Sequence, residues 1–172
     1  MNKRLPLSLL AVLAIASATA SAQQSPARTG SLAVPANKIV GMWDTQPSIA
    51  PCGSPPPTGP TGRTTLLFIT GGTWVENPRF PPSGIPGTGG SLSQRSAGLG
   101  VWSYDPATTQ YTAHMQFDWY LGGVYDGYQT VDRTILLSSD GKLASGPVRS
   151  TRYAANGSVL MELCGSGAGT RL

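Results

Sequence analysis

The segment QYTAHMQFDWY, residues 110–120, predicts the fold most directly. Its odd-numbered positions are apolar and its even-numbered positions are mainly polar, which is the alternation of a β-strand between two faces of a sheet. The apolar set is Tyr111, Ala113, Met115, Phe117 and Trp119. We therefore expect this apolar face to line a hydrophobic interior. His114, the only histidine of the chain, should lie on the opposite face, in water.

Seven further segments are short and β-rich, and turn sequences separate the later ones. They are residues 38–46, 63–70, 72–76, 98–104, 124–138, 142–153 and 157–167. The Asp-Gly pair at 140–141 and the Asn-Gly pair at 156–157 favour the positive φ angles of tight hairpins, so each strand should pair with its neighbour in sequence. No helical periodicity of useful length is present, which predicts few helices.

The only two cysteines of the chain, Cys52 and Cys164, lie just past the first predicted strand and on the last one. A disulfide between them requires Cα atoms within about 7 Å and would make those two strands neighbours. Closure of the meander leaves no exposed strand edges. The sequence therefore predicts an all-β fold: an antiparallel up-and-down β-barrel of about eight strands, closed by one disulfide. An open β-sandwich joined by the same disulfide is the alternative.

The first residues indicate export. Lys3 and Arg4 precede an apolar run from Leu5 to Ala16, and the triplet at 20–22 reads Ala-Ser-Ala, a cleavage signal. A membrane-spanning helix needs about 20 apolar residues, so neither this run nor any later segment qualifies. We expect a signal peptide over 1–22, a flexible leader over 23–37 and a single barrel domain over 38–172 in a periplasmic or extracellular protein.

Charge and metal-binding residues are sparse. The chain has 12 basic and 8 acidic residues, and without Lys3 and Arg4 the basic ones do not cluster, which argues against nucleic acid as a partner. Two cysteines and one histidine fall short of a zinc site. No metal or cofactor is therefore expected. Two segments rich in proline and glycine, 47–62 and 78–90, predict long loops that could contact a protein partner.

Arg133 interrupts the apolar face of the segment 124–138. The other members of that face are Val131, Ile135 and Leu137. An isolated charge in a barrel interior is very unfavourable, so Arg133 needs an acceptor, with Glu76 the first candidate and Asp44 the second. Two interpretations stay open: a structural ion pair or an arginine whose head reaches the rim, and an anchor for an anionic or carbonyl group of a ligand.

Four segments are similar, in order, to a known group of proteins. They are IVGMWDTQ (39–46), RSAGLGVWSY (95–104), DRTILLSSDGKL (132–143) and CGSGAGTRL (164–172). Together they resemble small exported bacterial proteins with a lipocalin-like, or calycin-like, barrel and no settled function. The resemblance covers most of 38–172 and implies that Trp43 packs across the closed end of the barrel, where Arg133 could cover it. A weaker likeness to allene oxide cyclase barrels carries no matching catalytic motif.

Our leading functional prediction is a barrel that binds a small, mostly apolar molecule. The predicted wall residues are Phe68, Trp102, Met115, Phe117 and Trp119, with Arg133 and Glu76 as the polar pair. One alternative is a cofactor-free isomerase or cyclase with Glu76 or His114 as the acid–base residue. The other is a protein-binding, inhibitor-like barrel that acts through the loops 47–62 and 78–90.

Overall fold

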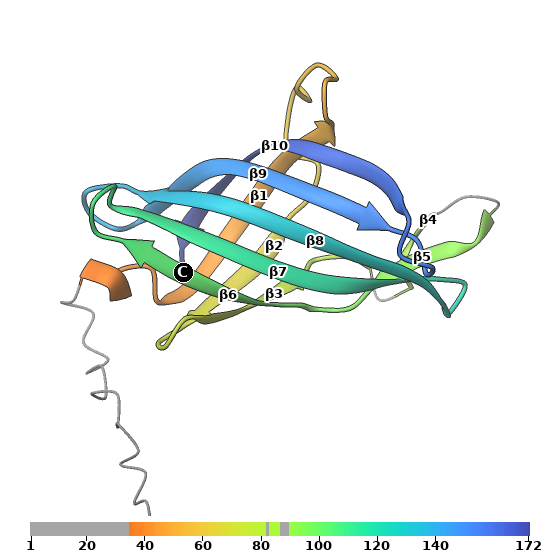
Figure 1. Ribbon diagram of the computed structural model, residues 1–172, viewed down its shortest axis with the longest axis horizontal. Coiled ribbons are helices and arrows are strands. Elements are labelled where there is room, and N and C mark those ends of the chain that lie inside the picture. The colour runs from red at the N-terminus through yellow and green to blue at the C-terminus, as the bar shows by residue number, and fades with distance from the viewer. Residues whose placement is uncertain (1–34, 82, 87–89) are drawn as a thin grey trace, which may run out of the picture.

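The predicted barrel is confirmed in a computed structural model that describes residues 35–81, 83–86 and 90–172 (Figure 1). The strands are β1 (Gly41–Pro51), β2 (Thr64–Ile69), β3 (Thr73–Pro78), β4 (Ile85–Pro86), β5 (Leu92–Arg95), β6 (Gly98–Asp105), β7 (Gln110–Leu121), β8 (Val124–Leu137), β9 (Leu143–Tyr153) and β10 (Val159–Arg171). The 3-10 turn η1 (Pro35–Asn37) precedes the first strand. The predicted signal peptide and residues 23–34 of the predicted leader lie outside these residues.

Eight antiparallel strands close into a ring in the order β7-β6-β3-β2-β1-β10-β9-β8, and β8 pairs back with β7. The first and last strands are neighbours along nine residue pairs, from Trp43 opposite Arg171 to Pro51 opposite Leu163. Cys52 and Cys164 form the predicted disulfide, with their Cα atoms 4.9 Å apart. Closure thus satisfies the backbone groups that an open sheet would leave unpaired along its edges.

One end of the barrel is sealed, and we call it the closed end. The Arg171 guanidinium lies 4.4 Å from the ring centre of Trp43, and it donates hydrogen bonds to the carbonyl groups of Lys38, Val40 and Gly141. The Trp43 indole donates to the carbonyl of Ile39 at 2.8 Å. Arg171, and not Arg133, therefore covers Trp43.

The expectation for Arg133 was wrong because of strand register. Arg171 lies directly opposite Trp43 in the β1–β10 pair, whereas Arg133 pairs with Ala113 of β7 and Val148 of β9. The segment η1 completes the closed end, since the Tyr111 hydroxyl donates to the Pro35 carbonyl at 2.6 Å. Burial raises the pKa of Tyr111 to about 12.

Aromatic side chains fill the half of the barrel next to the closed end. Phe68 and Trp74 stack with ring centres 5.3 Å apart, and Trp102 meets Phe68 edge-on at 6.3 Å. The indole of Trp102 donates to the Thr73 carbonyl at 2.9 Å, so its polar atom is satisfied. We call the half of the barrel that contains these rings the closed half, and the other the open half.

The opposite end, the open end, carries β4, β5 and the turns β7–β8 and β9–β10 (Figure 1). The loop predicted at 47–62 begins five residues late, because β1 continues to Pro51. The pairing of β1 with β2 ends at Thr45, and beyond that point β10 is the only strand that pairs with β1, so β1 tolerates proline along its other edge. The segment 78–90, predicted as a loop, contains the short strand β4, which pairs with β5.

Candidate functional site

The strands β5 and β6 both pair with β7, one after the other, and the chain between them has one residue more than a regular strand would have. Arg95 lies opposite Trp119 of β7, whereas Leu99 lies opposite Gln116, so four steps on one chain match three on the other. Directly opposed residues in a sheet share a face, and Trp119 is on the inner face of β7. The extra residue, a β-bulge, therefore turns Arg95 into the barrel, whereas a regular strand would point it outward.

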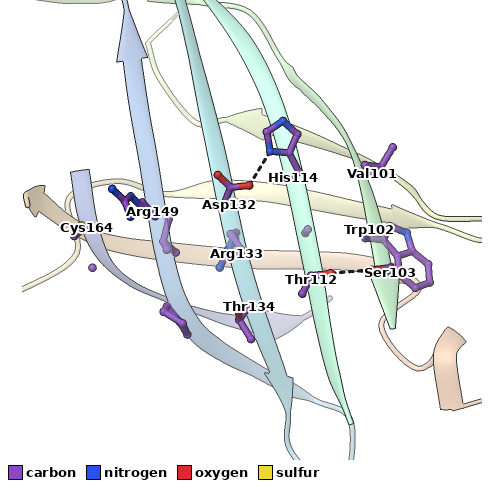
Figure 2. A pocket seen from close by; sticks show the side chains of 14 residues that line it. Val101, Trp102, Ser103, Thr112, His114, Asp132, Arg133, Thr134, Arg149 and Cys164 are labelled. Atoms are coloured by element: carbon purple, nitrogen blue, oxygen red, sulfur yellow. Dashed lines mark hydrogen bonds and ion pairs between the residues drawn. The ribbon is translucent and has the colours of Figure 1, made fainter. Parts of the chain in front are cut away.

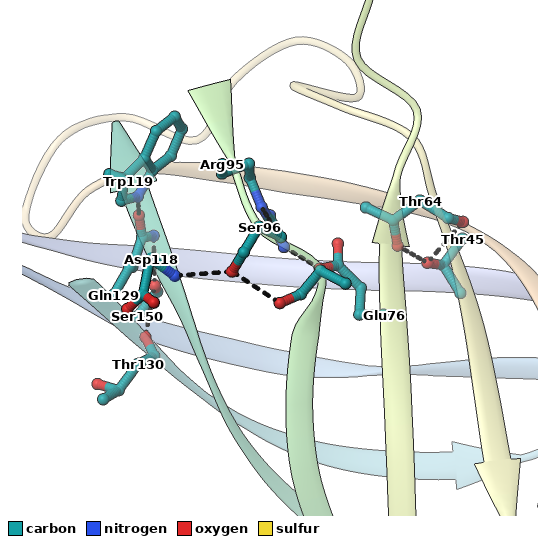
Figure 3. Close-up of polar contacts among 11 residues, drawn as sticks. Thr45, Thr64, Glu76, Arg95, Ser96, Asp118, Trp119, Gln129, Thr130 and Ser150 are labelled. Carbon is teal, nitrogen blue, oxygen red and sulfur yellow. Dashed lines mark hydrogen bonds and ion pairs between the residues drawn. The ribbon is translucent and has the colours of Figure 1, made fainter. Parts of the chain in front are cut away.

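Arg95 forms a buried ion pair with Glu76 of β3 (Figure 3). The two side chains are 8% and 2% exposed. The guanidinium also lies 3.4 Å from the ring centre of Phe117 on β7, which adds a cation–π contact. Glu76 is therefore bound to Arg95, and the expected pair of Arg133 with Glu76 was wrong.

Asp44, the second candidate partner of Arg133, is also bound elsewhere. It accepts a hydrogen bond from Nε of Arg63 at 2.9 Å and lies 3.5 Å from Nη2 of Arg79. The hydrogen bond from Arg63 is the main cause that lowers the pKa of Asp44. Asp44 faces outward, because its neighbours Trp43 and Thr45 on β1 face the interior.

Arg133 lies on the inner face of β8, is partly buried, and has no counter-charge among the described residues. Its Nε is buried without a hydrogen-bond partner. In the part of the chain that the structure describes, no other group forms a hydrogen bond or ion pair with its guanidinium. Burial lowers the pKa of Arg133 from 12.5 to about 10, which leaves the side chain protonated at neutral pH. The guanidinium occupies space above Gly167 of β10, where a Cβ would collide with Nη2.

An inner cavity of about 80 Å³ lies in the open half of the barrel. Its lining includes three charged side chains, Glu76, Arg95 and Arg133. The remaining lining residues are Thr45, Pro47, Ile49, Thr64, Leu66, Met115, Phe117, Gln129, Val131, Val148 and Ser150. Since Glu76 and Arg95 neutralise each other, the wall of this cavity carries one uncompensated positive charge.

Polar side chains of the cavity wall are held in place by hydrogen bonds (Figure 3). The Trp119 indole donates to Oε1 of Gln129 at 2.8 Å, and Nε2 of Gln129 donates to the Ser150 hydroxyl at 2.6 Å. That hydroxyl donates to the Thr130 carbonyl at 2.7 Å. The chain of bonds fixes Gln129 at the boundary between the inner cavity and the open end.

A second cavity, the mouth cavity, occupies about 290 Å³ at the open end. Ile85, Trp119, Met161 and Leu163 form its apolar part, and Ser93, Asp126, Gln129 and Arg152 its polar part. Arg152 is paired with Asp126 at 2.7 Å, so its charge is compensated. Gln129 lines both cavities, which places the mouth cavity directly outside the inner one.

The predicted wall residues divide between the two halves of the barrel. Met115 and Phe117 line the inner cavity and Trp119 lines the mouth cavity. Phe68 and Trp102 instead belong to the aromatic packing of the closed half. Sequence reasoning missed Arg95, which the bulge turns inward, and Gln129. Gln129 could have been found, because it interrupts the same face of β8 as Arg133.

His114 lies outside the barrel, as the alternation of β7 predicted. Its Nδ1 is 2.7 Å from Oδ1 of Asp132, and both side chains are more than half exposed. Figure 2 shows this pair beside a second polar pair, Ser103 and Thr112, whose hydroxyl oxygens are 2.8 Å apart. Together they border an outer groove of about 680 Å³. Glu76 and His114 are therefore on opposite sides of the barrel wall.

The described residues contain neither a metal-binding cluster nor a helix that could span a membrane. No group of three or more histidine, cysteine, aspartate or glutamate side chains in these residues could hold a metal ion. No helix in this part of the chain is long and apolar enough to cross a membrane.

Fold and cavities together define a closed eight-stranded antiparallel barrel with an inner cavity that holds one carboxylate and two guanidinium groups. Comparison of the chain with family models, with characterised proteins and with solved structures found no match. The resemblance to small exported lipocalin-like proteins therefore stays a prediction.

Proposed function

We propose that this protein binds a small molecule in the open half of its barrel, and that Arg133 contacts an anionic or carbonyl group of that molecule. The single observation behind the proposal is the uncompensated guanidinium on the wall of the inner cavity. A charge that is removed from water without a partner is unfavourable, and the lower dielectric around it strengthens its attraction for an acceptor. A ligand that supplies the acceptor would offset this penalty.

The position of the charge supports a binding role over a structural one. A structural arginine would be paired, as Arg95 is with Glu76 and Arg171 with backbone carbonyl groups at the closed end. Arg133 has neither kind of partner among the described residues. Its guanidinium offers a planar array of donors that suits a carboxylate or a carbonyl oxygen.

We place this function in an exported protein. The Cys52–Cys164 disulfide supports export, because disulfides persist mainly in oxidising compartments. The predicted signal peptide over 1–22 supports the same location. The isomerase or cyclase alternative has weaker support in the described residues, since Glu76 is bound to Arg95 and His114 lies on the outer surface.

The first experiment is native mass spectrometry of the protein isolated from the exported fraction of its cells, followed by solvent extraction of any bound molecule. We expect a discrete additional mass on the wild-type protein. Arg133→Met should lose that mass, because the charge is removed while most of the side-chain volume is kept.

The matched control is Arg149→Met. Arg149 lies on the outer face of the adjacent strand, 63% exposed and paired with Glu162 at 3.1 Å, so its loss should leave the bound mass unchanged. A bare wild-type protein that takes up no anionic or carbonyl compound would overturn the proposal. Equal loss of the mass in both variants would do the same.

A further inference from the structure

We infer that the ligand is an amphipathic monocarboxylate whose head group meets Arg133 and whose apolar chain extends through the mouth cavity. This inference rests on the proposed function and adds the charge, the polarity and the orientation of the ligand. Three observations carry it: the charge balance of the inner cavity, the sizes of the two cavities, and the chemistry of their walls.

The charge balance favours a single negative charge. The inner cavity is lined by one carboxylate, on Glu76, and two guanidinium groups, on Arg95 and Arg133. A monoanion neutralises the remaining positive charge. A dianion would leave an unpaired negative charge in the same enclosed space, which is as unfavourable as the unpaired guanidinium. Among monoanions, a carboxylate matches the planar geometry of guanidinium best.

The size of the inner cavity limits what enters it. Ligand pockets commonly measure about 300–1,000 Å³. The inner cavity is about 80 Å³, which is enough for a carboxylate head group and a few carbon atoms. The mouth cavity is about 290 Å³ and adjoins it at Gln129. Any larger ligand anchored at Arg133 must therefore continue into the mouth cavity.

The wall of the mouth cavity is suited to an apolar chain. Ile85, Trp119, Met161 and Leu163 supply apolar surface. The two charged residues there, Arg152 and Asp126, are already paired with each other. Further apolar side chains stand exposed on the turns of the open end: Val124, Val159 and Leu160 are 71%, 59% and 56% exposed. A second charged group on the ligand would find no free partner among the described residues of this wall.

The path from Arg133 to the mouth cavity runs along β8. Arg133 and Gln129 are four residues apart on the inner face of this strand, which corresponds to about 13 Å at roughly 3.3 Å per residue. That spacing separates the two backbone positions, and both side chains line the same inner cavity, so a carboxylate bound to the Arg133 guanidinium needs only a few carbon atoms before its chain reaches Gln129. Acetate fills only the anchor, whereas a medium-chain carboxylate fills both cavities.

The test is a titration series of straight-chain carboxylates from acetate to dodecanoate, followed by calorimetry and by intrinsic tryptophan fluorescence, to which Trp119 in the mouth cavity contributes. Delipidated wild-type protein is used. We expect the affinity to rise about fourfold for each methylene group that enters the mouth cavity and then to level off when the chain reaches solvent. Decanol and decylamine, which lack the negative charge, should bind at least tenfold more weakly than decanoate.

Two variants test the contribution of Arg133 and that of the mouth cavity separately. Arg133→Met should weaken acetate and decanoate alike, roughly tenfold to a hundredfold, because both lose the charged partner. Met161→Gln should weaken decanoate several-fold and leave acetate unchanged. Its matched control is Met42→Gln, because Met42 is 49% exposed on the outer face of β1 and Met161 is 46% exposed at the mouth.

The outcomes distinguish this inference from the proposed function. If acetate and decanoate bind equally well, both through Arg133, the apolar chain has no site and the inference fails while the proposed function stands. Tighter binding of inorganic phosphate than of any carboxylate would also overturn the inference alone. If no compound in the series binds, or if Arg133→Met binds them as the wild type does, the proposed function itself fails.

Discussion

The closed and open halves of this barrel share the same eight strands, yet they are filled in different ways. The closed half contains packed aromatic rings, and the indoles of Trp43, Trp74 and Trp102 donate to backbone carbonyl groups. The open half contains an ion pair, a hydrogen-bonded chain at Gln129 and an unpaired arginine around a cavity. This difference indicates that packing of apolar rings stabilises one half, whereas the other half keeps a cavity, which is the space that we propose for a ligand.

The largest effect should come from the covalent link beside the open half. Replacement of both Cys52 and Cys164 by serine removes a cross-link between residues 112 positions apart. The free energy of unfolding should fall by about 4–5 kcal/mol, because the unfolded chain regains the entropy of a long open loop. Urea unfolding measured by far-UV circular dichroism tests this.

Reduced wild-type protein is the control, and it should unfold at the same urea concentration as the double variant. An unchanged midpoint in the double variant would show that strand pairing between β1 and β10 closes the barrel without covalent help. The open half would then be more stable than the comparison of the two halves implies.

Substitutions at the two interior arginine sites should change the free energy of unfolding in opposite directions. Glu76→Gln leaves the Arg95 guanidinium buried without its counter-charge, so the free energy of unfolding should fall by roughly 3–5 kcal/mol. Arg133→Met removes a charge that has no partner in the described part of the chain, so the ligand-free protein should gain roughly 1 kcal/mol or more. Urea unfolding of delipidated protein measures both changes.

Arg149→Met, on the outer surface, should change the stability by no more than about 0.5 kcal/mol. A loss of stability in Arg133→Met comparable to that in Glu76→Gln would mean that Arg133 is a structural residue. The contrast between a paired and an unpaired arginine would then be lost.

Truncation of buried apolar side chains should lower the stability more in the closed half than in the open half. Phe68→Ala in the closed half removes a ring stacked on Trp74 and should destabilise by about 3–5 kcal/mol. Met115→Ala in the open half should destabilise by only about 2 kcal/mol, because Met115 already borders the inner cavity. Thermal and urea unfolding test both variants, and equal losses would contradict a difference in packing between the halves.

The smallest effect concerns alkaline pH at the closed end. Burial raises the pKa of Tyr111 to about 12 from an ordinary value of 10. The unfolded chain therefore loses this proton first, so the stability contributed by the neutral hydroxyl is complete below pH 10 and is lost as the pH rises toward 12. Urea midpoints measured across this window should fall with pH in the wild type and fall less in Tyr111→Phe.

Tyr125→Phe is the matched control, because Tyr125 is 45% exposed at the open end. This substitution should leave the dependence of the urea midpoint on pH as it is in the wild type. If the urea midpoint of Tyr111→Phe falls with pH as steeply as that of the wild type, the hydroxyl at the closed end is not protected by burial. The seal between β7 and η1 would then be looser than the hydrogen bond to Pro35 indicates.

The sequence by itself determined the strands of the barrel and the disulfide, because both depend on local signals. Alternation placed β7 correctly from Gln110 onward with His114 outside, Asp-Gly and Asn-Gly turns set the neighbouring pairs, and the two cysteines set the closure. The same alternation placed Arg133 inside the barrel, since a residue's face on a regular strand depends only on its parity.

The tertiary structure alone decided which charges meet. A single extra residue between Arg95 and Leu99 reversed the parity of β5, brought Arg95 to Glu76 and left Arg133 without a partner among the described residues. The register of β1 on β10 gave Trp43 the cover of Arg171. Bulges and register depend on pairing between strands that are distant in sequence, and no local pattern encodes which arginine remains free.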